Sequence, residues 1–227
     1  MKIEIPDNLF GKPIKGAMEK VLAKESPGED EAGTDAPSLG GFEYVPSIGL
    51  YVEMQKEFHG KNWNEATQEL HSRGDRKPTP YEFVEFIKHL RMKNTDEARA
   101  VLDEIYSVRD PWRAEWLDAR FDSGAMKYYV FGDSGIEEKT RNLTGVLMDD
   151  KFPGINLETW LSDNEFGFPK NNIDRGLLYY WKPADKKVAR FGANLGRAVL
   201  DCYGDPDCRS ASLGVRAVRR LRKNFLT

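Results

Sequence analysis

Residues Val188–Arg220 read VARFGANLGRAVLDCYGDPDCRSASLGVRAVRR. The stretch is rich in Gly, Asp, Arg and small residues, and it holds both cysteines of the protein, Cys202 and Cys208. It contains no Lys, Glu, Gln, Met or Trp, although Lys and Glu are plentiful elsewhere in the chain. Short apolar segments flank a polar loop, a pattern typical of two strands and their connection. The stretch therefore predicts a binding surface held by strands rather than a catalytic centre.

The C-terminal half of the chain predicts a small antiparallel sheet with long loops. Residues 132–176 alternate charged turns with isolated aromatics and are expected to be loops, whereas residues 112–121 fit a strand and a helix equally well. Apolar and aromatic runs mark the expected strands. These runs are Met126–Phe131, Leu177–Trp181, Val188–Phe191, Ala198–Cys202 and Leu213–Arg220.

The preceding part predicts a hairpin and three helices. The hairpin covers Phe42–Val52 and turns around Pro46 and Ser47. A first helix is expected from Asn62 or Asn64 to Gly74, with Trp63, Ala66, Thr67 and Leu70 on its buried side. Thr79-Pro80 is a helix start signal, and the helix after it carries Phe83, Ile87 and Leu90 inward. Thr95 opens a third helix whose apolar face is Ala98, Val101, Leu102, Ile105 and Tyr106. Helices followed by short strands predict an α+β class.

The N-terminal residues predict two further segments. Residues 1–24 are expected to form a helical arm, because Phe10, Ile14, Met18 and Val21 are spaced along one apolar stripe. Residues 25–41 are acidic and rich in Gly and Pro, which is typical of a flexible linker. The arm either docks and oligomerises or packs back on the domain of residues 42–227, and both alternatives stay open.

Composition limits the classes of function. The chain has 227 residues, 40% hydrophobic residues and a formal net charge of -3. These values are typical of a globular protein that has no general electrostatic attraction to polyanions. No apolar run is long enough for a membrane span, and the N-terminus lacks the basic-then-apolar order of a signal peptide. We therefore expect no membrane insertion, no nucleic acid partner, and cytoplasmic synthesis, with retention there or assembly into a virion or surface structure.

Histidines and cysteines give no clear catalytic pattern. His59, His71 and His89 lack ligand spacing to one another and are expected to have surface or cap roles. Cys202 and Cys208 could form a copper or thiol-redox pair, but their C-x5-C spacing matches no zinc motif. The preferred interpretation is two unrelated cysteines of an exposed loop.

The charged residues of the same stretch offer two other hypotheses. Asp201, Asp205 and Asp207 are carboxylates of the kind that calcium prefers, but no D-x-D-x-D-G order is present, so the prediction is no cofactor, with calcium as an open alternative. The basic run Arg216–Lys223 could attract nucleic acid, but no aromatic residues alternate with its cations. We interpret it as a solvated strand end, with Arg219 opposite to Arg216.

The end of the chain resembles a known family. Trp181, the run Val188–Phe191, a polar loop and the run Ser212–Arg216 resemble the C-terminal part of the C-type lectin fold. The closer resemblance is to the branch of formylglycine-generating enzymes and of variable proteins from diversity-generating retroelements. In that branch an L-G-F-R-like strand lies in the central sheet, and Val215 stands here where the aromatic is usual. Residues 42–180 match only in the order of their elements, and residues 1–41 lie outside the resemblance.

Two members of this branch imply different functions. The enzyme holds copper with a cysteine pair well upstream of its L-G-F-R, and around Val188 and Ala193 this chain has none. In the retroelement proteins, adenines of Asn codons are randomised, which can give every residue type except Lys, Glu, Gln, Met and Trp. All residues of Val188–Arg220 belong to that reachable set. The resemblance thus implies a display protein that binds a macromolecular target, such as a surface protein, without chemistry.

Alternation along the strands predicts which side chains carry the fold and which are displayed. The fixed inward set is predicted to be Trp181, Ala189, Phe191, Ala198, Leu200, Leu213, Val215 and Val218. The exposed variable set is predicted to be Gly192, Asn194, Leu195, Gly196, Val199, Asp201, Tyr203, Gly204, Asp205, Asp207, Cys208 and Ser210. Tyr203 is the predicted anchor of the binding site. The alternatives are an oxidase like the formylglycine-generating enzymes and an ordinary phage or viral structural domain.

Overall fold

A computed structural model describes residues 37–106, 112–145, 147–148, 151–170, 174–194 and 197–221, of which residues 151–153, 164–165 and 194 are described by their backbone alone. The predicted helical arm of residues 1–24 and most of the predicted linker lie outside this part. Residues 37–227 form one compact unit.

The N-terminal hairpin is confirmed, and the C-terminal part of the chain joins it. Strands β1 (Phe42–Val45) and β2 (Leu50–Glu53) pair in antiparallel register on either side of a turn at residues 46–49. Strand β13 (Val218–Arg219) pairs with the other side of β2. The resulting order β1-β2-β13 brings the two ends of the described chain into one small sheet.

The three predicted helices are also confirmed. They are α2 (Trp63–Ser72), α3 (Pro80–Lys93) and α4 (Asp96–Tyr106), and a short helix α5 (Leu157–Ser162) comes later in the chain. Asn62 and Thr79 cap α2 and α3, because each side chain accepts a hydrogen bond from the backbone N–H three residues later. In both helices the glutamate at that third position accepts a hydrogen bond from the backbone N–H of the capping residue, so each helix begins with a complete capping box.

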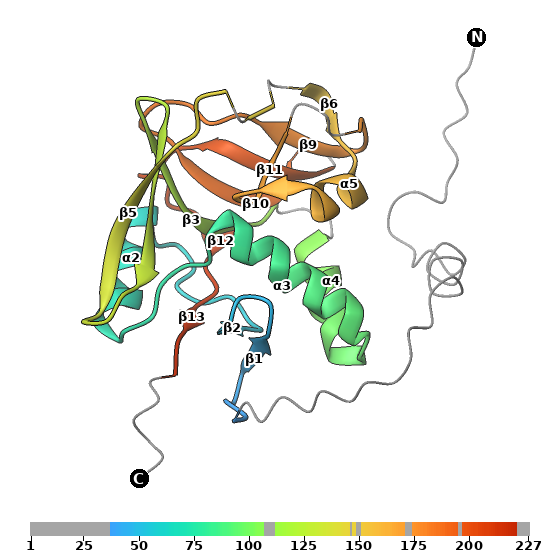
Figure 1. Ribbon diagram of the computed structural model, residues 1–227. Helices are drawn as coiled ribbons and strands as arrows, with labels where there is room; N and C mark the ends of the chain where they lie inside the picture. The colour runs from blue at the N-terminus through green and yellow to red at the C-terminus, as the bar shows by residue number, and fades with distance from the viewer. Residues whose placement is uncertain are drawn as a thin grey trace. The chain divides into compact units, whose positions relative to one another are not determined.

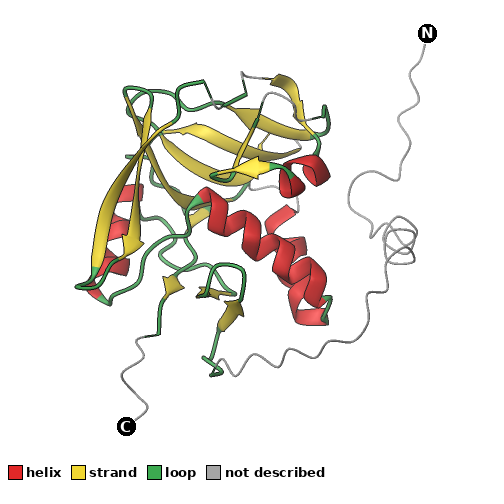
Figure 2. Cartoon of the chain, in the orientation of Figure 1, coloured by secondary structure: helices red, strands yellow, loops and turns green. Residues whose placement is uncertain are grey.

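The main sheet has eight strands and is mostly antiparallel (Figures 1 and 2). Its order is β5-β4-β3-β10-β11-β9-β6, and β12 (Leu213–Gly214) pairs with β3 in parallel. Strands β9 and β11 are also parallel to each other. The bounds are β3 Ala114–Asp122, β4 Ala125–Phe131, β5 Ile136–Asn142, β6 Lys151–Ile155, β9 Leu178–Trp181, β10 Val188–Asn194 and β11 Arg197–Gly204.

Two expectations about these strands are wrong. Residues 132–176 contain β5, β6, α5 and the small hairpin of β7 (Asn164–Glu165) and β8 (Phe168–Pro169), rather than long loops alone. Strand β5 was missed because it is a charged, exposed edge strand, and its composition resembles that of a turn. The predicted strand Leu213–Arg220 is broken into β12 and β13, because the residues between them leave the ladder.

Two hydrophobic clusters lie on opposite faces of the main sheet. On one face, Leu117, Phe191 and Leu200 pack with α3, α4 and α5, as Figure 1 shows for α3 and α5. On the other face, Trp116 and Val188 pack with α2 and β12. The α+β class is therefore confirmed. No helix of the described part is both long and apolar enough to cross a membrane.

Candidate functional site

The predicted variable residues fall into three groups. Tyr203, Asp205 and Asp207 are exposed, and Cys208 and Ser210 are half-buried, so these five side chains reach the surface. The prediction of exposure is wrong for Gly192, Val199, Asp201 and Gly204, which are buried. The side chain of Asn194 and all of Leu195 and Gly196 lie outside the described residues.

The two buried glycines are fixed by close backbone contacts. A Cβ atom at Gly192 would overlap with the backbone oxygen of Arg113 and with the Cβ of Ala114 on the neighbouring strand β3. A Cβ atom at Gly204 would lie 2.8 Å from the backbone oxygen of Val188. Simple alternation missed these contacts because it counts only the two faces of an isolated strand. Here the paired strands β3 and β10 approach the two positions too closely for a side chain.

Asp201 is buried because it pairs with Arg190 on the adjacent strand. The two residues are direct register partners, and the Arg190 Nε and Nη2 atoms lie 2.8 and 2.7 Å from Asp201 Oδ2. The other carboxylate oxygen accepts the backbone N–H of Tyr203 at 2.8 Å. The Asp201 side chain therefore organises the surface instead of being free to vary.

The predicted inward set is largely confirmed. Ala198 is half-buried and Trp181 is 38% exposed, so the prediction for Trp181 is wrong. Trp181 is the last residue of β9 and registers beside Asp201, on the face opposite to the buried Tyr180. The confirmed members, all buried, are Ala189, Phe191, Leu200, Leu213, Val215 and Val218.

Around the Arg190–Asp201 pair, large aromatic side chains remain exposed. Trp112 and Trp181 are both 38% exposed, and Tyr203 is 58% exposed. The Arg190 guanidinium lies 5.3 Å from the centre of the Trp112 ring, a cation–π distance. Trp112, Arg190 and Asp201 also line a small hollow of about 130 Å³. We call the set Trp112, Trp181, Arg190, Asp201 and Tyr203 the aromatic surface.

The sequence prediction missed both tryptophans of the aromatic surface. Trp112 is the first residue of the segment 112–121, which fits a strand and a helix equally well, so the sequence predicts no exposed face for it. Trp181 was assigned to the core because aromatic residues in strands are usually buried. The available signal was that Tyr180 and Trp181 are adjacent in a strand and must point to opposite faces.

The loop after β11 is held by the N-terminus of α2. The backbone N–H of Trp63 donates a hydrogen bond of 3.0 Å to the Pro206 carbonyl. Arg209 forms an ion pair with Glu65 at 2.5 Å, and the Arg209 side chain is exposed while that of Glu65 is half-buried. Asp205 accepts the backbone N–H of Asp207 and of Cys208, which closes a tight turn. The loop thus presents its side chains from a fixed backbone.

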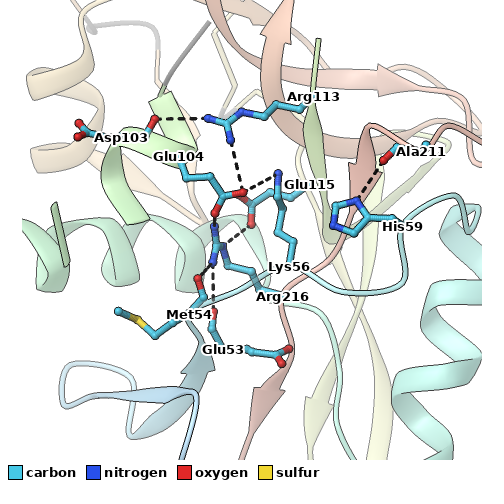
Figure 3. A network of polar contacts seen from close by, with 10 residues as sticks. All are labelled: Glu53, Met54, Lys56, His59, Asp103, Glu104, Arg113, Glu115, Ala211 and Arg216. Carbon is cyan, nitrogen blue, oxygen red and sulfur yellow. Dashed lines mark hydrogen bonds and ion pairs between the residues drawn. The ribbon is translucent and has the colours of Figure 1, made fainter. Parts of the chain in front are cut away.

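A buried polar network around Arg216 fixes the chain just after β12 (Figure 3). Arg216 is fully buried, and its guanidinium contacts Glu115 at 2.8 Å, Glu104 at 3.1 Å and the backbone oxygen of Met54. The interpretation of this basic run as a solvated strand end is therefore wrong for Arg216. Burial raises the pKa of Glu104, but the charges of Arg216 and Lys56 outweigh it and hold that pKa below its ordinary value.

The two cysteines lie in different surroundings. Cys202 is a fully buried residue of strand β11, and it packs in the cluster that contains Phe191 and Leu200. Cys208 is half-buried and packs against the other cluster, which contains Trp63 and Trp116. The expectation of two exposed loop cysteines is wrong for Cys202. Both thiols are free, and the sheet separates the clusters to which they belong.

The other candidate ligands of metals are used in the fold. Asp201 pairs with Arg190, while Asp205 caps its own turn. His59 contacts the Ala211 carbonyl at 3.2 Å, and His89 contacts Glu43 at 2.8 Å. No group of three His, Cys, Asp or Glu side chains is placed to hold a metal ion within the described ranges.

Comparisons of the chain with protein-family models, with curated proteins and with solved structures found no match. The function is therefore inferred from the aromatic surface, the Arg190–Asp201 pair within it and the loop after β11.

Proposed function

We propose that this protein is a ligand-binding display protein with a C-type lectin-type domain. The aromatic surface and the loop after β11 bind a macromolecular target, a surface protein, without chemistry. The observation that carries this proposal is the gathering of Trp112, Trp181 and Tyr203 around the Arg190–Asp201 pair. The side-chain variety in this segment is attributed to a diversity-generating retroelement.

Exposed aromatics of this kind are suited to protein recognition. Tyr and Trp provide a large contact area with few rotatable bonds, so little conformational entropy is lost when they are immobilised. An apolar surface ringed by polar groups often marks an interaction site. The Arg190–Asp201 pair provides hydrogen-bonding groups in the middle of the surface, and Arg, Trp and Tyr are the residues enriched at binding hot spots.

The division between scaffold and display also supports the proposal. Strand β12, at the Leu213-Gly214 sequence that carries the resemblance, is buried beside β3 in the main sheet. The strands before it bury Phe191 and Leu200 on one face and present the aromatic surface on the other. A fold tolerates altered side chains where they do not carry the core.

Close contacts between the strands exclude several residues from the proposed variable positions. Gly192 and Gly204 do not accept a larger side chain without movement of the backbone, and Asp201 is committed to Arg190. The proposed variable positions are therefore those of the loop whose side chains reach solvent. They are Tyr203, Asp205, Asp207, Cys208, Arg209, Ser210 and Ala211.

The oxidase alternative requires Cys202 and Cys208 to bind one copper ion. Their placement in separate clusters on opposite faces of the sheet does not favour such a site. Elemental analysis of the purified protein after incubation with copper is expected to find no stoichiometric metal. Stoichiometric copper that is lost in Cys202→Ser would reverse the order of the two proposals.

Two experiments test the display proposal. The first compares DNA: a near-copy of the DNA for Val188–Ser210 that differs only at adenines, beside a reverse transcriptase gene, is expected. Absence of such a copy from the source genome would remove the retroelement part of the proposal.

The second experiment tests the surface itself. Codons for Tyr203, Asp207, Arg209 and Ala211 are randomised, the library is displayed on yeast, and lysozyme serves as the probe target. We expect folded variants and lysozyme binders. A matched library at the buried Ala189, Phe191, Leu200 and Leu213 is expected to lose surface expression. If both libraries lose expression equally, the loop is structural and the proposal is wrong.

A further inference from the structure

A second hollow lies away from the aromatic surface, between helix α2 and strands β3, β4 and β5. Its volume is about 420 Å³, within the range typical of small-molecule sites. Helix α2 and the β4–β5 ribbon lie beside each other in Figure 1. The chemically distinctive side chains of its lining are Trp63 and His71 from α2, Arg120 from β3, Lys127 and Tyr129 from β4, and Glu138 from β5.

Two cations stand opposite each other at the edge of this hollow. Arg120 and Lys127 are direct register partners of the antiparallel pair β3–β4. Like charges in this position repel and destabilise a sheet. Asp122 offsets the charge of Lys127 through an ion pair of 3.1 Å, but Asp122 does not line the hollow. Arg120 is exposed and forms no ion pair with any of the described residues. The pair therefore carries surplus positive charge toward the hollow.

His71 places an imidazole ring in the lining of the hollow. Its Nε2 atom is buried and has no hydrogen-bond partner among the described residues. Its ring packs edge-on against Tyr129, with ring centres 4.5 Å apart. Burial lowers the pKa of His71, and the charges of Lys77 and Arg76 lower it further. The His71 ring thus forms part of the lining beside Tyr129, next to Arg120 and Lys127.

Glu138 on β5 places a negative charge at the side of the hollow away from Arg120. Glu138 is the register partner of Tyr129, and burial and the Glu138 charge raise the pKa of the Tyr129 hydroxyl. A ligand with its negative group beside Glu138 would be repelled, so the negative group belongs at Arg120 and Lys127. The rings of Tyr129, His71 and Trp63 leave an aromatic wall for the rest of the ligand.

We propose that this hollow binds a small molecule through a carboxylate or phosphate group that Arg120 and Lys127 hold, with the body of the molecule against Tyr129 and His71. Arg120 supplies the planar fork that binds an oxyanion with two parallel hydrogen bonds. The His71 ring lines the same hollow beside Tyr129, so its resonances report on a bound ligand. The site is independent of the aromatic surface, because the two share no residue.

The three histidines allow a direct test, because the chain contains only His59, His71 and His89. Imidazole resonances of the full-length protein are followed by NMR during titrations with benzoate and, separately, with inorganic phosphate. We expect a saturable shift at His71 and none at His59 or His89. Arg120→Gln is expected to weaken binding by about tenfold or more, because one charged contact to an oxyanion is lost.

Lys139→Gln is the matched control, since Lys139 is an exposed cation on the neighbouring strand β5 and does not line the hollow. It is expected to bind like the wild type. Saturation by benzoate alone identifies a carboxylate ligand, saturation by phosphate alone identifies a phosphate ligand, and saturation by both identifies a general oxyanion site. If His71 shows no saturable shift with either probe, or if Arg120→Gln, folded by thermal melting, binds as tightly as the wild type, the proposal is overturned.

Discussion

The Nε atom of Arg216 donates a hydrogen bond of 2.8 Å to Oε2 of Glu115, and both side chains are buried. The bond joins the end of the proposed variable segment to β3, the strand beside which β12 lies. Arg216 also contacts Glu104 and the Met54 carbonyl, so one guanidinium ties four parts of the chain together. The loop after β11 therefore lies between two polar contacts, the Arg190–Asp201 pair on its N-terminal side and the Arg216 network on its C-terminal side.

Arg216→Ala is expected to lower the free energy of unfolding by about 3–5 kcal/mol, because it leaves the buried Glu115 carboxylate without its partner. Urea denaturation at neutral pH measures the change. Arg220→Ala is the control, since Arg220 is exposed and a surface change costs within about 0.5 kcal/mol. Equal losses in the two variants would contradict the role of the buried pair.

The core beneath the aromatic surface is expected to be far more sensitive than the surface. Phe191→Ala and Leu213→Ala should each cost about 2–5 kcal/mol, because both side chains are fully buried. Tyr203→Ala and Asp207→Ala should cost within about 0.5 kcal/mol, while Tyr203→Ala weakens target binding most. Thermal melting of the four variants separates the two classes. Early melting of Tyr203→Ala and Asp207→Ala would show that the loop carries the fold.

Gly192→Ala is expected to destabilise the protein by about 1–3 kcal/mol, because its Cβ overlaps with the backbone of Arg113 and with Ala114. Gly40→Ala is the matched control, because no atom lies within 4 Å of a Cβ built at that position. Its effect should stay within about 1 kcal/mol. A shift in melting temperature no larger for Gly192→Ala than for Gly40→Ala would return Gly192 to the set of variable positions.

A carboxyl group in the β1-β2-β13 sheet makes stability depend on pH. Burial and the neighbouring Glu57 raise the pKa of Glu53 from 4.5 to about 7. Since the folded protein then binds a proton more tightly than the unfolded chain, this contribution is complete below pH 4.5 and is lost as pH rises through about 7.

Glu53→Gln removes this titration while it keeps an oxygen to accept the backbone N–H of Ala217. The stability of the variant relative to the wild type should therefore increase between about pH 5 and about pH 8. Chemical denaturation at several pH values gives this difference. A difference that stays constant across the range would show that Glu53 does not titrate near neutrality.

Thiol labelling distinguishes the two cysteines. Cys208 is half-buried in the loop, whereas Cys202 is fully buried in β11. A thiol reagent should label Cys208 in the folded protein and Cys202 only after unfolding, and Cys208→Ser should fold like the wild type within about 0.5 kcal/mol. Fast labelling of both thiols in the native state would show that β11 opens readily.

Local signals in the sequence predicted the helices well. Asn62 and Thr79 marked the starts of α2 and α3, because a capping side chain acts within a few residues of itself. The strand β5 could not be predicted in this way, since its charged residues pair with β4 on an exposed edge. Hydrophobic patterning marks buried faces and does not mark edge strands.

The candidate site was predicted only in part, and for a related reason. Tyr203 and Asp207 were correctly placed at the surface, because the loop between Cys202 and Cys208 is hydrophilic. Arg190 and Arg216 were not expected to have buried partners, because Asp201 and Glu115 meet them only through strand pairing and the tertiary fold. Sequence patterns carry polarity, whereas the choice of partner depends on register and on distant elements.

The pairing of β13 with β2 has a consequence for protein synthesis. Tyr51 and Val52 pair with β1 on one side of β2, but their partners on the other side, in β13, exist only when the ribosome has translated through Arg219, beyond the proposed variable positions. A mutation that shifts the reading frame or ends translation within residues 188–210 removes β12, β13 and Arg216 together. The edge of β2 then stays open and the polar anchor is missing, so we expect the shortened chain to be much less stable than the complete one. Completion of the fold therefore depends on a chain that is translated in frame through Arg219, whatever side chains the loop after β11 carries.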